Sequence, residues 1–261
     1  MDGRQVETLQ LQHFGTSFAT RDGFFERLYE RINVRRTTRA LDLADPNRVL
    51  EVGPGSGRLM AYLSGLGHDV VGLDLSPTVA KHIEQRWKLR VMVGTLAALN
   101  PVPLNGSFDV IIMRHVLEHF LDPAAALRTA YLALRSEGRL YLAVPNMGSW
   151  HRGFRGWSGY EPYHLHFFCV ESLLAALHRA GFHVSKSATH EPLTGWPNTL
   201  ARSVWPPQDR KPGDAPRRGA GRSILELGRF AAGIVLSPLR WYQSLAMRGE
   251  ELTVVAVKSA R

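Results

Sequence analysis

The sequence predicts an α/β fold built around a mostly parallel sheet with helices on both faces. Three observations support this prediction. The short apolar run Arg48–Val52 meets a glycine-rich loop, and a run of helical character, Arg58–Leu63, follows the loop directly. Further short runs rich in β-branched residues, among them Asp69–Asp74, Leu89–Val93 and Ser107–Met113, each end in a polar turn. Strands and helices alternate between residues 48 and 146, which is typical of a parallel sheet.

The same patterns suggest how the chain is divided. We expect residues 1–45 to form a helical lead-in, because Phe24, Phe25, Leu28, Tyr29 and Ile32 recur at helical spacing. The main domain is expected over residues 46–189 together with 251–261. Between them, residues 190–250 form an insertion with a basic loop and an amphipathic helix. Long connections of this kind usually carry function or lack regular structure.

The glycine-rich loop is the strongest motif. Gly53, Gly55 and Gly57 alternate with other residues, and glycine lets the chain turn tightly and lets a ligand approach main-chain N–H groups. A strand, a glycine loop and a helix in that order form the nucleotide-binding entry of a Rossmann-like sheet. Asp74 ends the next strand, where a carboxylate can accept both hydroxyls of an adenosine ribose. An NAD site is the competing interpretation, but it predicts Gly-x-Gly-x-x-Gly spacing, which this loop lacks.

Several motifs together carry a family resemblance. They are Glu51-Val-Gly-Pro-Gly-Ser-Gly57, Leu73-Asp-Leu-Ser-Pro77, Phe108-Asp-Val110, Val116-Leu-Glu-His-Phe-Leu-Asp-Pro123, Ser136–Asn146 and Ala180-Gly-Phe182. With them the chain resembles class I S-adenosylmethionine-dependent methyltransferases, of the bacterial small-molecule group that includes ubiquinone-type O-methyltransferases. The resemblance covers roughly residues 31–189 and the last strand. It implies a seven-stranded sheet whose last strand, Glu251–Lys258, enters antiparallel beside the fifth, with S-adenosyl-L-methionine as cofactor.

The resemblance also implies which residues contact the cofactor. The set is Arg36, Glu51, Gly53, Gly55, Gly57, Asp74, Leu75, Thr95, Leu96 and Arg114. Arg36 enters as a partner for the methionine carboxylate, by the placement of an arginine in ubiquinone-type relatives. The family usually places Asp or Asn after the third strand to hold the adenine amino group. Thr95 stands there instead, so we expect base recognition to rest on backbone groups of Thr95 and Leu96.

A sulfonium cofactor carries its own activation, so the protein must align the acceptor and exclude water. A hydroxyl acceptor also benefits from a base with a near-neutral pKa, and histidine is the usual choice. The candidates are His115, His164 and His166. His-x-His spacing in an extended segment places both rings on one side, and the resemblance places His164 at the rim of the acceptor pocket. Ordinary hydrogen bonding in a loop is the competing interpretation for each histidine.

The segment His115-Val-Leu-Glu118-His119 allows three interpretations. Its spacing matches the inverted zinc-protease pattern, although its position after a buried strand argues against that chemistry. Glu118 and His119 can instead cap backbone groups at a helix start. Ubiquinone-type relatives link acids and a histidine in this segment to a divalent cation, but Arg114 and His115 stand where a second acid is needed. We therefore expect no metal.

Aromatic residues gather after the fifth predicted strand. Trp150, Phe154, Trp157 and Tyr160 alternate with glycines, beyond the sheet edge where open α/β sheets place ligands. We expect them to wall an apolar or sugar-like acceptor. Covering the sheet edge is the alternative.

Composition points to a cytoplasmic enzyme. The chain has 261 residues and one cysteine, Cys169, and its first residues lack the apolar core of a signal peptide. The formal net charge of +9 suits nucleic acid, an anionic membrane or an acidic substrate. No clear nucleic-acid-binding motif is present. Basic residues gather in a stretch after Trp196 that we expect to be a loop: Arg202, Arg210, Lys211, Arg217, Arg218 and Arg222.

Apolar residues recur at helical spacing over Ile224–Leu245, between and around Arg229 and Arg240. The apolar core of this helix is too short to cross a bilayer. It could lie on a membrane surface with Trp241 and Tyr242 at the interface. Packing on the protein's own sheet or on a second subunit is the interpretation we favour.

The sequence therefore predicts an S-adenosylmethionine-dependent methyltransferase that acts on a small molecule at oxygen. A sugar, a quinone-type compound or a lipid-linked molecule is the expected acceptor, and peripheral contact with the inner face of a membrane would fit the last. The alternatives are a non-catalytic binding protein that keeps the cofactor fold, or a nucleic-acid or protein methyltransferase.

Overall fold

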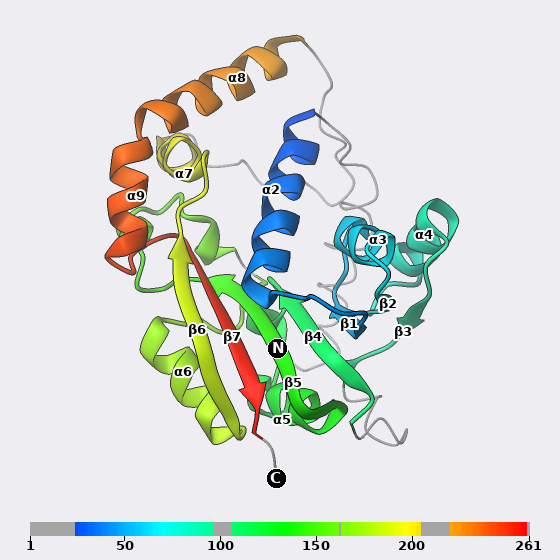
Figure 1. Ribbon diagram of the computed structural model, residues 1–261. Coiled ribbons are helices and arrows are strands. Elements are labelled where there is room, and N and C mark those ends of the chain that lie inside the picture. The colour runs from blue at the N-terminus through cyan, green and yellow to red at the C-terminus, as the bar shows by residue number, and fades with distance from the viewer. Residues whose placement is uncertain (1–23, 97–105, 162, 205–219, 260–261) are drawn as a thin grey trace.

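The computed structural model describes residues 24–96, 106–161, 163–204 and 220–259. A seven-stranded sheet forms its centre, in the order β3-β2-β1-β4-β5-β7-β6 (Figure 1). The strands are β1 (Arg48–Val52), β2 (Asp69–Asp74), β3 (Val91–Val93), β4 (Phe108–Arg114), β5 (Leu134–Pro145), β6 (Phe182–His190) and β7 (Glu251–Lys258). β7 runs antiparallel to β5 and β6, and the other described pairs are parallel. The predicted fold class is confirmed.

Helices cover both faces of the sheet. α2 (Phe24–Leu41), α3 (Arg58–Gly65) and α4 (Pro77–Trp87) pack on one face, while α5 (Pro123–Ala133) and α6 (Val170–Arg179) pack on the other. Alternate residues of β4 face the two sides of the sheet. Val110 and Ile112 join the core beneath α2, α3 and α4, whereas Ile111 and Met113 join the core beneath α5 and α6. This double burial explains why the central strands are continuous apolar runs.

Local signals in the sequence set the starts of two helices. Ser76 precedes α4 and its hydroxyl accepts a hydrogen bond from the Val79 N–H at 3.4 Å. Asp122 precedes α5 and its carboxylate accepts from the Ala125 N–H at 2.9 Å. A proline follows each cap at the first helical position, where its missing N–H costs nothing.

The buried face of α2 differs from the predicted stripe. Tyr29 and Ile32 expose 39% and 47% of their surface. Val34, Thr37 and Leu41 are buried instead, at spacings of three and four residues. The C-terminal half of α2 packs on β5 and α3, so this half selects the buried side of the helix.

The insertion contains more helix than the sequence predicted. α7 (Gly195–Val204) occupies the start of the stretch predicted to be a loop, so that part of the prediction is wrong. The single predicted helix over 224–245 is also wrong, because it is divided into α8 (Ala220–Val235) and α9 (Ser237–Leu245). Pro238 lies in the first turn of α9 and cannot donate the hydrogen bond that would continue α8. The basic positions 210, 211, 217 and 218 lie outside the described residues.

The predicted packing of this helical segment on the protein's own sheet is only partly correct. α9 contacts β6, yet Ile234 and Trp241 expose 63% and 68% of their surface. Within the described ranges, none of the helices combines the length and the apolar character needed to cross a bilayer.

Candidate active site

The glycine loop after β1 has the backbone that its sequence predicts. Gly53, Gly55 and Gly57 have φ angles of 66°, 55° and 72°, in the left-handed region that favours glycine. A Cβ atom on Gly53 would lie 2.6 Å from Cγ2 of Val116, which follows β4. The loop therefore packs closely against the segment that carries His115, Glu118 and His119.

Asp74 ends β2 beside this loop. One oxygen of its carboxylate accepts a hydrogen bond from the Ser76 N–H at 2.8 Å. Burial raises the pKa of Asp74 to about 6, and the Ser76 N–H offsets only part of that effect. A second donor pair, such as two ribose hydroxyls, would favour the ionised form. Gly94, after β3, donates to the Asp74 carbonyl at 2.9 Å and so holds the two strand ends together.

Two polar side chains at the carboxyl ends of β1 and β4 each have a buried hydrogen-bonding atom that is unused. Glu51 is 2% exposed, and its Oε2 atom has no hydrogen-bond partner among the described residues. Arg114 contacts Glu30 at 3.6 Å through Nη2, while its buried Nη1 atom lacks a partner within the same residues. An acceptor and a donor left unpaired in this way match the ammonium and carboxylate of an amino acid. These residues therefore fit the methionine end of the cofactor.

The other predicted cofactor residues divide into three groups. Arg36 contacts the carboxylate of Glu251 through Nη2, so its predicted role toward the methionine carboxylate stays a prediction. Leu96 is 1% exposed and joins the sheet core, while Leu75 is half-buried. Thr95 is exposed after β3, and its use for the adenine also stays a prediction.

His115 lies at the end of β4 in a left-handed conformation with φ 53°, which is uncommon outside glycine. Its Nε2 atom is 3.0 Å from Glu251 and its Nδ1 atom 3.6 Å from Glu118. Burial alone would lower the pKa of His115, but its contacts to the two carboxylates outweigh burial and raise the pKa to about 10. Burial opposes ionisation of Glu251, yet His115 and Arg36 bring its pKa down to about 2. The group is thus a compact ion-pair cluster.

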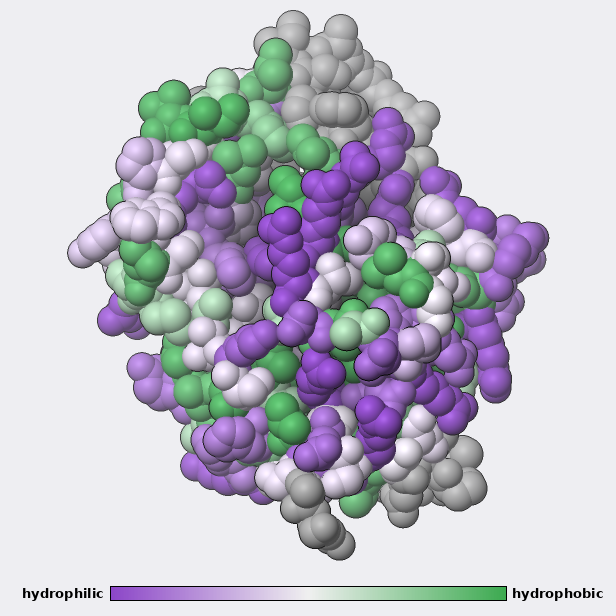
Figure 2. All heavy atoms as spheres, viewed as in Figure 1, coloured by the Kyte–Doolittle hydropathy of each residue, from purple (hydrophilic) through white to green (hydrophobic). Residues whose placement is uncertain are grey.

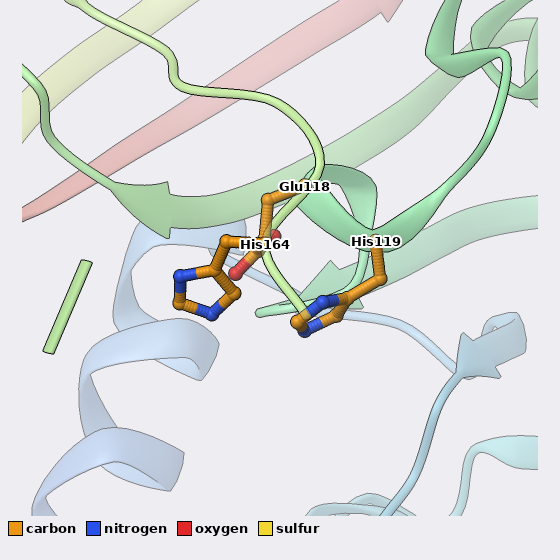
Figure 3. Close-up of side chains that lie close together, drawn as sticks. All are labelled: Glu118, His119 and His164. Atoms are coloured by element: carbon orange, nitrogen blue, oxygen red, sulfur yellow. The ribbon is translucent and has the colours of Figure 1, made fainter. Parts of the chain in front are cut away.

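Glu118, His119 and His164 form a second cluster beside the first. Glu118 and His119 belong to the short 3-10 helix η2 (Leu117–His119), and His164 follows η4 (Ser158–Tyr160). Figure 3 shows the three side chains converging, and one ligand atom from each lies within 4.8 Å of the others. Glu118 is 1% exposed and its carboxylate oxygens accept no hydrogen bond from the described residues. A carboxylate with two imidazoles also suits a divalent cation by ligand type.

Backbone carbonyls hold both imidazoles of this cluster. Nδ1 of His119 lies 3.0 Å from the Tyr163 oxygen, and Nδ1 of His164 lies 2.9 Å from the Gly159 oxygen. A carbonyl only accepts, so each Nδ1 carries a proton and each Nε2 is an acceptor in the neutral ring. Burial lowers the pKa of His119 below its usual value. The sequence analysis considered His119 as a helix cap or a metal ligand and did not name it among the candidate bases. Its position in the Val-Leu-Glu-His motif was the signal that could have indicated it.

Two other groups of predicted site residues contribute no ligand atom to this cluster. The His166 N–H donates to the Glu118 carbonyl at 3.1 Å, but the His166 ring is not among the clustered ligands. Among the aromatics after β5, Trp157 is only 2% exposed. Phe154 packs edge-on against Trp196 of α7 at 5.5 Å. Both rings therefore contribute to packing, and their use as an acceptor wall stays a prediction.

Comparisons with known proteins agree with this geometry. A family model described as a methyltransferase domain matches residues 24–187. A "probable S-adenosylmethionine-dependent methyltransferase" of Mycobacterium tuberculosis is 30% identical over 156 residues, which cover 59% of this chain and 53% of that protein. A ubiquinone biosynthesis O-methyltransferase of Xanthomonas oryzae is 34% identical over 111 residues, covering 41% of this chain and 46% of its own. The chain thus spans about half the length of these relatives.

Solved structures share the fold at low sequence identity. One is a 1,6-didemethyltoxoflavin-N1-methyltransferase of Burkholderia thailandensis with bound 1,6-didemethyltoxoflavin and S-adenosylhomocysteine, at 17% identity and a TM-score of 0.55, covering 98% of this chain and 88% of that one. Another is a methyltransferase of Haloferax volcanii in complex with the activator Trm112, at 16% identity and a TM-score of 0.60, covering 96% and 98%. Because the family model spans more than half of the chain, the chain belongs to the class I S-adenosylmethionine-dependent methyltransferases, as the sequence predicted.

Proposed function

We propose that this chain transfers a methyl group from S-adenosylmethionine to a hydroxyl oxygen of a small molecule. The cluster of Glu118, His119 and His164 carries this proposal, because it supplies a neutral base next to the glycine loop. Only an acceptor that must lose a proton, such as a hydroxyl, needs a base of this kind.

His119 is the residue that we assign as the base. Its lowered pKa keeps the ring neutral near pH 7, and its Nδ1–H donates to the Tyr163 carbonyl. The lone pair is then on Nε2, the atom that accepts a proton. His115 fits this role less well, because its contacts to Glu118 and Glu251 raise its pKa and so favour the protonated ring, which cannot accept a proton. Its charge instead holds Glu118 and Glu251 ionised at the edge of the site.

The chemistry follows from these protonation states. S-adenosylmethionine supplies an electrophilic methyl group on a sulfonium when it is bound. With the cofactor bound, the Nε2 atom of His119 would accept the hydroxyl proton as the acceptor oxygen bonds to the methyl carbon and the carbon–sulfur bond breaks, which releases S-adenosylhomocysteine. The buried carboxylate of Glu118 then lies close enough to stabilise the imidazolium. Glu51, Asp74 and Arg114 orient the donor, so alignment and base catalysis come from separate residues.

Acceptor identification and two histidine variants test the proposal. Mass spectrometry of a cell extract incubated with the protein and methyl-labelled cofactor should reveal a labelled small molecule. With that acceptor, His119→Asn should lower kcat by roughly 10²–10⁴-fold and leave S-adenosylhomocysteine affinity unchanged. His178→Asn, an exposed histidine in α6, is the matched control. Full activity of His119→Asn and of His164→Asn would remove the base from this cluster, and label on a nitrogen would overturn O-methylation.

We also propose that the acceptor is reached at a membrane surface, as a lipid-linked or quinone-type molecule. The exposed apolar residues of α8 and α9 support this, because such side chains gain free energy at a lipid interface. The named relatives in ubiquinone biosynthesis agree with a quinone-type acceptor. If the labelled product is water-soluble and membranes do not increase turnover, this part of the proposal fails while methyl transfer stands.

A further inference from the structure

The two insertion helices carry an exposed apolar face, which we call the α8–α9 face. Its members each expose between 58% and 78% of their surface: Leu227, Ile234, Val235, Trp241, Tyr242 and Leu245. Figure 2 shows hydrophobic atoms gathered over α8 at the upper left of the molecule. A contiguous apolar surface of this kind usually marks an interaction site.

α9 has its polar side toward the protein and its apolar side exposed, the reverse of an ordinary surface helix. Gln243 is fully buried and donates to Glu191 at 2.9 Å, while accepting from Trp196 at 2.8 Å. Arg240 also turns inward and donates to the Glu191 carbonyl at 2.9 Å. These polar anchors fix the rotation of α9, so Trp241 is directed outward. The protein therefore holds its apolar side toward the surroundings.

A cleft with two arginines borders this face. Its volume is about 470 Å³, and it is lined by Gly148, Ser149, Trp150, Arg152, Gly153 and Arg248. The Trp150 ring lies 6.0 Å from that of Tyr242, which joins the cleft to the α8–α9 face. Arg248 donates to the Gly148 carbonyl at 3.0 Å, and this contact holds its guanidinium at the wall. In the described part of the chain neither Arg152 nor Arg248 forms a salt bridge, and the exposed carboxylate of Glu171 is the acid that the charge of Arg248 affects.

We propose that this cleft binds the phosphate of an anionic phospholipid headgroup while the α8–α9 face enters the interfacial layer of the bilayer. The proposal rests on the proposed contact with a membrane and gives it a specific site. A guanidinium donates two parallel hydrogen bonds to phosphate oxygens, which makes arginine suited to this ligand. Trp150, Trp241 and Tyr242 are amphipathic rings of the kind that gather at headgroup level. Phosphate recognition and apolar insertion thus meet along one side of the protein.

The positive net charge of the chain favours binding to an anionic lipid over binding to a neutral lipid. The formal net charge is +9. Basic residues near an anionic surface each contribute about 1 kcal/mol. The headgroup assignment therefore predicts a preference for phosphatidylglycerol over phosphatidylcholine.

Vesicle sedimentation with the full chain tests the site. Wild-type protein should bind phosphatidylcholine vesicles that contain phosphatidylglycerol and should bind pure phosphatidylcholine weakly. The double variant Arg152→Gln/Arg248→Gln should lose roughly 25-fold in partitioning, from about fivefold per charge. Arg90→Gln/Arg179→Gln is the matched control, since it removes two exposed charges near the opposite ends of the strands. Trp241→Ser/Leu245→Ser should also release the protein, with an unchanged melting temperature because both residues are exposed.

Four results would overturn the proposal. Equal partitioning of the cleft variant and its control would show that the cleft does not hold a headgroup. Calorimetry that finds tight binding of inorganic phosphate, which then displaces the vesicles, would assign the cleft to a soluble anion. A dimer in light scattering that Trp241→Ser/Leu245→Ser dissociates, without vesicle binding, would give the α8–α9 face to a second copy of the chain. Failure of the wild-type protein to sediment with phosphatidylglycerol vesicles would remove the membrane site altogether. If methyl transfer persists in that case, the proposed activity stands although the membrane site fails.

Discussion

Cofactor binding should release a proton from Glu51 near neutral pH. Burial raises the pKa of this carboxyl to about 8, and the charge of Arg114 only partly offsets that effect. At pH 7 the side chain is therefore mostly protonated. A ligand ammonium beside the unpartnered Oε2 atom would favour the carboxylate, so the proton leaves as the ligand binds.

The magnitude follows from the pKa. Ionising Glu51 one unit below its pKa costs about 1.4 kcal/mol. A charge-assisted hydrogen bond returns about 1.5–3 kcal/mol, so the net gain at pH 7 is small. Glu51→Gln should consequently weaken S-adenosylhomocysteine by no more than roughly 15-fold at pH 7. The number of protons released is the sharper observable, because only the wild-type side chain can supply one.

Isothermal titration calorimetry in two buffers of different ionisation enthalpy measures that number. We expect release of roughly 0.3–0.8 proton per bound S-adenosylhomocysteine between about pH 6.5 and 7.5, and a Kd that falls about three- to sevenfold over that interval. Asp74 contributes less in this range because its pKa is about 6. Glu51→Gln should abolish the release and flatten the pH dependence. The same proton count in wild type and variant would refute the assignment of Glu51 to the ligand ammonium.

The remaining predictions concern the loop, the ion-pair cluster and the metal. Gly55→Val, which forces a β-branched residue to φ 55°, and Asp74→Ala should each weaken S-adenosylhomocysteine by about 1–3 kcal/mol or more in calorimetry; unchanged affinity in both folded variants would contradict the cofactor site. The pKa of His115 is raised in the folded state, so its ion pairs stabilise the fold below pH 6.5 and lose this contribution as the pH rises toward 10. With 47% of this side chain exposed, the contribution is at most about 1 kcal/mol, and urea unfolding of His115→Asn should show a smaller loss between those pH values than wild type. EDTA should leave turnover intact, because sulfonium transfer needs no Lewis acid; loss restored by zinc would instead make Glu118 and His119 metal ligands.

Local signals explain how far the sequence could predict the fold. The positions of the strands along the chain, the helix caps at Ser76 and Asp122, and the left-handed glycines of the loop are decided within a few residues, and each is present in the structure. The apolar spacing in α2 did not indicate which side of the helix is buried. Packing against β5, about a hundred residues away, selects that side. The insertion was less predictable for the same reason. Gln243 and Arg240 of α9 find their partner in Glu191, and this long-range contact decides which side of the helix is exposed.

The ion-pair cluster illustrates why a site is harder to predict than its fold. Motifs at the ends of β1, β2 and β4 carried the predicted cofactor residues, since a parallel sheet brings its carboxyl ends to one edge. Glu251 has no such motif. It begins the antiparallel strand β7, and the sheet register places it where it meets Arg36, from α2, and His115, from β4. Arg36 and Glu251 are 215 positions apart, so the pair can be recognised only in the folded structure. The contact with Glu251 raises the pKa of His115 and favours its protonated form, and for this reason we assign the role of base to His119 instead of His115.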